Sequence, residues 1–208
     1  MSIIITVVAS IVGFVSLFTL FSNDDDTGIS IMSGFGEITI FDPKQPSIFE
    51  NYLYYDDKLS FQLLKPNNDW NISMASESMN VDELAYLESV GFLDGVYLEK
   101  ESDKLFLISV FDVKSKNFQL NDYFTRQIAL MDFDEDVKVP IKQISQSNDW
   151  AIFSFDMETD ADDSYAEQLL FLKNDKLYML HYSGKSPENL TELEKSNFNS
   201  ILNSFEVI

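Results

Sequence analysis

The amino-acid sequence predicts an α+β fold in which a mainly antiparallel sheet is flanked by helices. Two observations lead to this prediction. Apolar residues alternate along several short segments that are separated by polar turns, as in strands joined by hairpins. Elsewhere, apolar residues recur at helical spacing behind helix-capping residues. The patterns together predict about six to eight strands and about three helices.

The strand patterns are clearest in the second half of the chain. Residues 165–182 should form a hairpin in which Asn174-Asp175 is a two-residue turn between two apolar runs. Residues 95–113 should form two strands around a polar turn at Glu101–Asp103. The second of these strands is apolar enough to be a central strand covered on both faces. Further strands are expected at residues 59–65, 137–145 and 150–157.

Two helices are expected between these strands. Asn80 has Glu83 three residues later, the spacing of a capping box, and this pair predicts a helix over residues 81–90. A second helix is expected over residues 121–131, where apolar residues share one stripe.

A third helix is expected near the C-terminus. It begins either at Ser186-Pro187 or at Thr191, because Thr191 and Glu194 also have capping-box spacing. Its apolar residues follow the i, i+3, i+4, i+7 pattern, which predicts an amphipathic helix packed on a sheet. They are Phe198, Ile201, Leu202 and Phe205.

The first 23 residues carry no charged side chain. Ile3 to Phe21 would span ~28 Å as a helix, close to the ~30 Å hydrocarbon core of a bilayer. We therefore expect one N-terminal transmembrane helix. The domain organisation that follows is a membrane anchor at 1–23, a linker at 24–51 that could hold a short hairpin, and a globular domain at 52–208.

Cleavage and orientation of the anchor are separate questions. No Lys or Arg precedes the apolar segment, and Leu20 is a poor −3 residue for cleavage after Ser22, so an uncleaved anchor is favoured over a signal peptide. Neither flank carries Lys or Arg, so the positive-inside rule does not decide the orientation. We expect a single-pass cell-membrane protein whose acidic domain is extracytoplasmic, with the opposite orientation as the alternative.

The charge of the chain restricts its partners. There are 35 Asp and Glu against 14 Lys and Arg, a formal net charge of −21, and all of these residues follow residue 23. Such a surface repels nucleic-acid phosphates and anionic lipid headgroups, so no nucleic-acid partner is expected. It favours cations, basic proteins or simple solubility. The absence of Cys excludes disulfides, thiolate metal sites and a cysteine nucleophile.

No catalytic residue or cofactor can be singled out. His181 is the only histidine, and beside Leu177 and Met179 it is expected to be a packed or edge residue. Transition-metal sites usually need several His or Cys ligands. The sequence also lacks a Gly-x-Ser-x-Gly elbow and a P-loop. We therefore do not expect an enzyme. A hydrolase that uses carboxylates is the least favoured alternative.

One acidic segment is a candidate calcium site, because calcium binds six to eight hard oxygen ligands. From Asp156, an EF-hand would need Gly at the sixth position and Glu at the twelfth. The chain has Ala161 and Glu167 there, so only half the pattern is present. A solvated loop is the favoured alternative to a metal site. The candidate ligands are Asp156, Glu158, Asp160, Asp162 and Asp163.

Two parts of the globular region resemble a known family. "YYDDKLSFQLLKPNNDWNI" resembles the opening of the PsbP-like superfamily, in which an aromatic-containing strand is followed by Pro, a turn and Trp. "EQLLFLKNDKLYMLHYSG" and "EKSNFNSILNSFEVI" resemble its close, a hairpin followed by a helix and a final strand. The resemblance covers about residues 52–208. It rests on Phe61, Pro66, Trp70, Tyr178, Tyr182, Phe198, Ile201, Ser204 and Phe205.

The resemblance implies an α/β/α sandwich and a binding or assembly role rather than catalysis. The superfamily includes extrinsic proteins of the photosystem II oxygen-evolving complex, a Ran-binding nuclear factor and bacterial envelope lipoproteins. This chain differs in its N-terminal apolar segment and in lacking a lipobox cysteine, so neither manganese-cluster nor Ran binding is carried over.

The sequence thus leads to two expectations about function. The first is a membrane-tethered, extracytoplasmic, non-catalytic binding or assembly module with an unidentified protein partner. The alternative is an acidic cell-surface protein that binds calcium.

Overall fold

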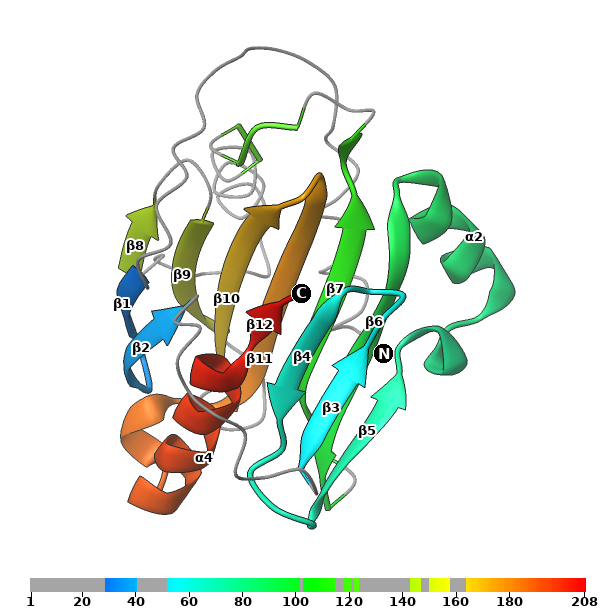
Figure 1. Cartoon of the computed structure of the whole chain (residues 1–208). Coiled ribbons are helices and arrows are strands. Elements are labelled where there is room, and N and C mark those ends of the chain that lie inside the picture. Colours follow the sequence, from blue (N-terminus) through cyan, green and yellow to red (C-terminus); the bar gives the residue numbers. More distant parts are fainter. Residues whose placement is uncertain are drawn as a thin grey trace.

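A computed structural model describes residues 29–40, 52–101, 103–114, 118–120, 122–123, 143–146, 150–157 and 164–208. Within these residues the chain forms three antiparallel sheets and two α-helices (Figure 1). The expected α+β fold with mainly antiparallel sheets is confirmed. The membrane span expected at Ile3 to Phe21 lies outside the described residues. No helix in the described part of the chain is long and apolar enough to cross a bilayer.

The largest sheet has seven strands in the order β5-β6-β7-β11-β10-β9-β8, all antiparallel to their neighbours. The expected strand at 150–157 and the pair over 95–113 are confirmed, and only the end of the strand expected at 137–145 lies within the described residues. The strands are β5 (Trp70–Met74), β6 (Phe92–Lys100), β7 (Asp103–Asp112), β8 (Gln143–Gln146), β9 (Trp150–Met157), β10 (Ser164–Lys173) and β11 (Lys176–Lys185).

The hairpin at the centre of this sheet follows the sequence pattern closely. Lys173 pairs with Lys176, and between them Asn174 and Asp175 both have positive φ, at 54° and 59°. Two successive left-handed residues form the type I′ turn whose twist matches that of the flanking strands, and Asn and Asp tolerate this conformation better than most residues. The predicted two-residue turn is therefore confirmed.

Both faces of the seven-stranded sheet are covered. One face is packed against α4 (Glu192–Ser204) and a three-stranded sheet of order β12-β4-β3, made of Glu206–Val207, Phe61–Leu64 and Leu53–Asp56. The other face is packed against α2 (Val81–Ser89) and against Phe118, Leu120 and Tyr123. Strand β7 contributes alternate side chains to both hydrophobic clusters, as expected for a central strand.

Both helices begin at the predicted capping boxes. The Asn80 side chain accepts from the Glu83 N–H while the Glu83 carboxylate accepts from the Asn80 N–H, and Thr191 and Glu194 repeat the arrangement. The open choice for the last helix is thereby decided for Thr191. The residues Pro187–Asn189 form a short 3-10 turn (η3) before it. The helix expected over 121–131 lies almost entirely outside the described residues.

A two-stranded hairpin, β1 (Ile29–Ser33) and β2 (Gly36–Ile40), lies within the segment expected to be a linker. The side chain at its tip, Phe35, is only 5% exposed. Its ring makes edge contacts with Tyr182 and Phe198, at centroid distances of 4.8 and 5.2 Å. The tip therefore completes the core that β11 and α4 share. The division into anchor, linker and domain stays a prediction.

Candidate functional site

The structure describes little of the candidate calcium segment. Asp156 lies in β9, where its backbone pairs with Tyr165 of β10. The other four candidate ligands, Glu158, Asp160, Asp162 and Asp163, lie outside the described residues. Among the side chains that are described, no three His, Asp or Glu residues gather closely enough to hold a metal ion. The calcium site stays a prediction.

Glu167, the residue at the twelfth EF-hand position, has a different role. It is 4% exposed, in β10. Its carboxylate accepts hydrogen bonds from the Ser33 hydroxyl at 2.8 Å, the Gly34 N–H at 2.7 Å and the Tyr165 hydroxyl at 2.7 Å. Both oxygens are thus engaged in holding the β1–β2 hairpin to the sheet.

The sequence alone did not single out this contact, because residues 34 and 167 are 133 positions apart. Burial raises the pKa of the Glu167 carboxyl, although the hydrogen bonds from Tyr165, Gly34 and Ser33 act in the opposite direction. The contact is therefore a buried, proton-sensitive attachment for the N-terminal hairpin.

His181 is buried on the central strand β11, facing the cluster that α2 covers. Its ring Nδ1 lies 3.1 Å from the side-chain nitrogen of Gln168, its register partner on β10. Burial lowers the pKa of the imidazole to about 4, so the ring is neutral at physiological pH. The expectation of a packed histidine is confirmed.

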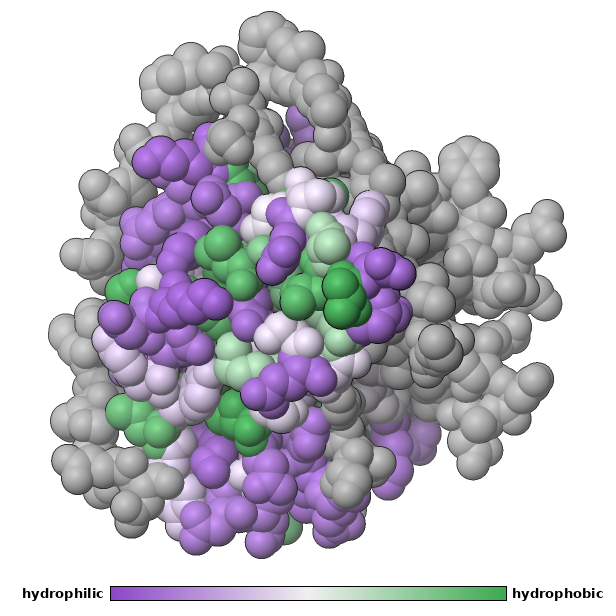
Figure 2. Space-filling model, turned by 90° about the vertical axis from the view of Figure 1, so that its right-hand side faces the viewer, coloured by the Kyte–Doolittle hydropathy of each residue, from purple (hydrophilic) through white to green (hydrophobic). Residues whose placement is uncertain are grey.

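An acidic region follows β4 in sequence. Residues 66–99 contain seven Asp or Glu and no Lys, Arg or His. They form β5, the 3-10 turn Ser76–Ser78 (η1), α2 and most of β6. Asp94 is buried and accepts from the Ser76 N–H and hydroxyl, whereas Glu77, Asp82 and Glu88 are exposed. Figure 2 shows this side of the molecule, where hydrophobic residues lie in several small groups among hydrophilic ones.

Strand β3, one of the two outer strands of the three-stranded sheet, contacts β5 of this region. In β3, Leu53 and Tyr55 are 38% and 55% exposed, whereas Tyr54 points inward. The Tyr54 ring packs on Phe61 at 5.9 Å, and its hydroxyl donates to the sulfur of Met74 in β5 at 3.8 Å. The described part of the chain pairs β3 with β4 alone, and we call its other edge, which no described strand pairs with, the open edge.

The residues that carry the family resemblance gather in one place. Ser204 links the helix to β4, because its hydroxyl accepts from the Leu64 N–H and donates to the Ile201 carbonyl. Pro66 is only half-buried. The others belong to the same hydrophobic cluster and are Phe61, Trp70, Tyr178, Tyr182, Phe198, Ile201 and Phe205. The resemblance is thus a resemblance of core packing.

The described residues thus form an α+β fold of three antiparallel sheets and two α-helices, with an acidic region at 66–99 and the open edge of β3. The structure is similar to the solution structure of cyanobacterial PsbP (CyanoP) from Synechocystis sp. PCC 6803, with a TM-score of 0.45 and 14% sequence identity. The similarity covers 79% of this chain and 98% of that one. No protein-family model and no curated protein sequence matches the chain. This is a similarity of fold at low sequence identity, and nothing about family or activity follows from it.

Proposed function

We propose that this chain is a non-catalytic binding or assembly module, held at a membrane by residues 3–21 with its globular domain on the extracytoplasmic side. The observation that carries the proposal is the edge of β3 that no described strand pairs with, where Leu53 and Tyr55 are exposed. An exposed apolar strand edge is a site for association with another chain.

The roles of the buried titratable groups support binding over catalysis. The Glu167 carboxylate is saturated by three donors from the protein itself, and His181 is enclosed within the sheet. General acid–base catalysis needs a group within hydrogen-bond reach of a substrate. The sequence resemblance of residues 52–208 to the PsbP-like superfamily implies the same class of function.

The experiment is a pull-down from detergent-solubilised membranes with the full anchored chain as bait. We expect a specific protein to be retained at low salt and released as ionic strength rises, because an acidic surface attracts a basic partner electrostatically. Recovery of no specific protein would count against the proposal.

Calcium binding by the acidic segment is the second candidate, favoured by the half-match to an EF-hand. Calorimetry of the full chain separates the two functions. No saturable heat up to about 1 mM calcium removes the second candidate. Heat that disappears in Asp160→Asn and persists in Asp175→Asn, a control on the β10–β11 turn, would establish it.

A further inference from the structure

The edge of β3 presents backbone groups as well as side chains. The Lys65 N–H donates to the Tyr52 carbonyl at 2.9 Å, so Tyr52 and Lys65 are a hydrogen-bonded pair of the β3–β4 ladder. In antiparallel strands such pairs alternate with pairs that do not exchange hydrogen bonds. Leu53 and Tyr55 therefore turn their N–H and C=O groups away from β4, towards the open edge.

The opposite side of the ladder supports this assignment. Leu64 is the register partner of Leu53, and its N–H donates to the Ser204 hydroxyl instead of to β3. The residues that offer their backbone to the open edge are also the two whose side chains are exposed. A strand added here would gain hydrogen bonds and apolar contacts from the same residues.

The edge is held in place from behind. The side chain of Tyr54 is anchored between Phe61 and Met74, as described above, and its hydroxyl also donates to the Asp56 carboxylate at 2.9 Å. The strand is thus fixed before any partner arrives, which reduces the entropy lost on association.

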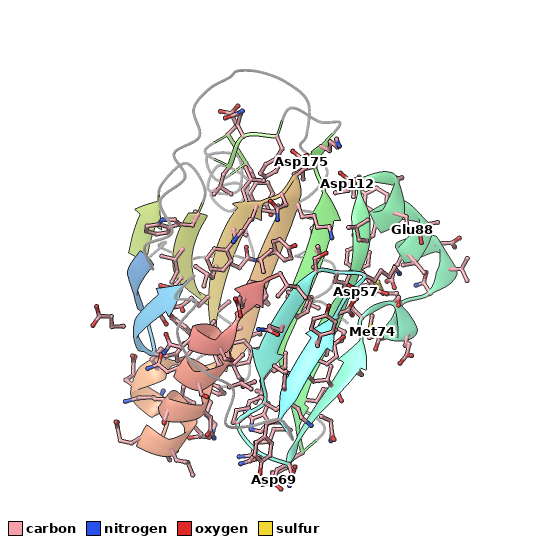
Figure 3. The ribbon with its side chains drawn as sticks, in the orientation of Figure 1. Asp57, Asp69, Met74, Glu88, Asp112 and Asp175 are labelled. Carbon is pink, nitrogen blue, oxygen red and sulfur yellow. The ribbon has the colours of Figure 1, made fainter. Side chains whose placement is uncertain are left out.

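Charge indicates what kind of strand fits. Asp57 follows one end of β3 and Asp69 lies at the turn near the other end, with Met74 between them (Figure 3). The nearby cations are Lys58, which is exposed and follows Asp57, and Lys65 and Lys176, which donate to the Trp70 carbonyl and the Ser60 hydroxyl. Across the whole chain 35 Asp and Glu outnumber 14 Lys and Arg, so an extended basic segment is attracted electrostatically.

We propose that the open edge of β3 binds an extended segment of a partner protein in which apolar residues alternate with Lys or Arg, by addition of a strand to the β12-β4-β3 sheet. The four residues of β3 span about 13 Å, enough to pair with about four residues of the partner. The inference rests on the proposed function, because it names the partner segment and its site.

The test uses fluorescein-labelled Lys-Val-Lys-Val-Lys-Val-Lys, with Glu-Val-Glu-Val-Glu-Val-Glu as the charge control. Fluorescence anisotropy measures their binding to the full chain in a nonionic detergent. We expect the basic peptide alone to bind. Tyr55→Pro removes an N–H that the β3–β4 ladder does not use, so the variant should fold and bind about three- to tenfold more weakly. Tyr55→Ala keeps the N–H and should lose less.

Two further variants locate the site. Leu53→Lys places a positive charge on the edge and should weaken binding of the basic peptide even if the proline variant folds poorly. Val81→Lys changes an 82% exposed apolar residue on α2 and should lower affinity far less than Leu53→Lys does. Equal binding by wild type and Tyr55→Pro, or a larger loss in Val81→Lys than in Leu53→Lys, overturns the inference.

Other outcomes are also decisive. Binding of the acidic peptide equal to that of the basic one overturns the choice of partner. A dimer of the chain that Tyr55→Pro dissociates would show that a second copy occupies the edge, and overturns it too. If a pull-down partner is retained equally by Tyr55→Pro, the proposed function stands and this inference fails.

Discussion

Glu167 attaches the N-terminal hairpin to the sheet, and its replacement tests that attachment quantitatively. Glu167→Ala removes the acceptor of three hydrogen bonds at a site that is 4% exposed. Each buried donor left unpaired costs about 1–3 kcal/mol, so we expect a loss of about 3–5 kcal/mol in the free energy of unfolding. Glu167→Gln keeps an acceptor and the shape but removes the titration.

The pH dependence separates these two effects. The folded pKa of Glu167 is raised above the ordinary value of 4.5 by burial. Below pH 4.5 the carboxyl is protonated in both states and its contribution to stability is complete. As pH rises, the unfolded chain ionises first, so the wild type loses stability until pH passes the folded pKa. Glu167→Gln has no such loss and should equal or exceed the wild type at pH 8.

The assay is urea unfolding of the full chain in nonionic detergent at several pH values between 4 and 8. Tryptophan fluorescence reports the transition, because Trp70 is 1% exposed in the folded state. Glu88→Gln, at an exposed position on α2, is the matched control and should follow the wild type at every pH. Two results would show that Glu167 is not a buried attachment of the hairpin. One is a free energy of unfolding of Glu167→Gln that equals that of the wild type at every pH in this range. The other is a loss of less than about 1 kcal/mol in Glu167→Ala.

Four further predictions concern three residues of the core. His181 is the only histidine, so its NMR resonances can be followed without ambiguity, and they should titrate near pH 4; a midpoint near 6.5 would show that the ring is not buried. Because the folded pKa of His181 is lowered, the unfolded chain binds a proton first as pH falls from 6.5 towards 4, so the folded chain should lose stability over this range. His181→Gln should remove this dependence of stability on pH. Phe35→Ala should cost about 3–5 kcal/mol in urea unfolding, because the ring is packed against Tyr182 and Phe198; a near-neutral result would mean that the hairpin tip is not part of the core. Trp70→Phe should cost much less than Trp70→Ala, because the indole N–H is buried without a hydrogen-bond partner among the described residues and its loss is no penalty; equal costs for the two variants would contradict this.

Local chemistry explains which parts of the fold could be predicted from the sequence. A two-residue Asn-Asp turn between apolar runs and two capping boxes each depend on residues within a few positions of one another. The strand predicted at 150–157 has those bounds in the structure. In these cases the residues that determine the element are also the residues that form it.

Long-range pairing explains what could not be predicted. The alternation of Ile29, Ile31, Ile38 and Ile40 suggested a hairpin within a linker, but nothing in that pattern connects its tip to Glu167 or to α4. The two-residue strand Glu206–Val207 is similar, because it is defined by pairing with Gln62 and Phe61 on β4.

The candidate site also combines a feature that the sequence shows with one that only long-range pairing determines. The exposure of Leu53 and Tyr55 depends on the order β12-β4-β3, which leaves β3 at the edge, and apolar periodicity in a sequence does not reveal strand order. The sequence shows that residues 66–99 contain no Lys, Arg or His. It does not show that strand β5 of this region contacts β3.

Site-directed photo-crosslinking in native membranes tests most directly whether the chain binds a partner protein at β3. p-Benzoyl-phenylalanine replaces Tyr55 in one protein and Leu193, a 70% exposed residue on α4, in a second as the control. We predict a crosslinked partner from position 55 only, attached through a segment in which apolar residues alternate with Lys or Arg. A partner captured from position 193 and none from position 55 would show that β3 is not the binding site.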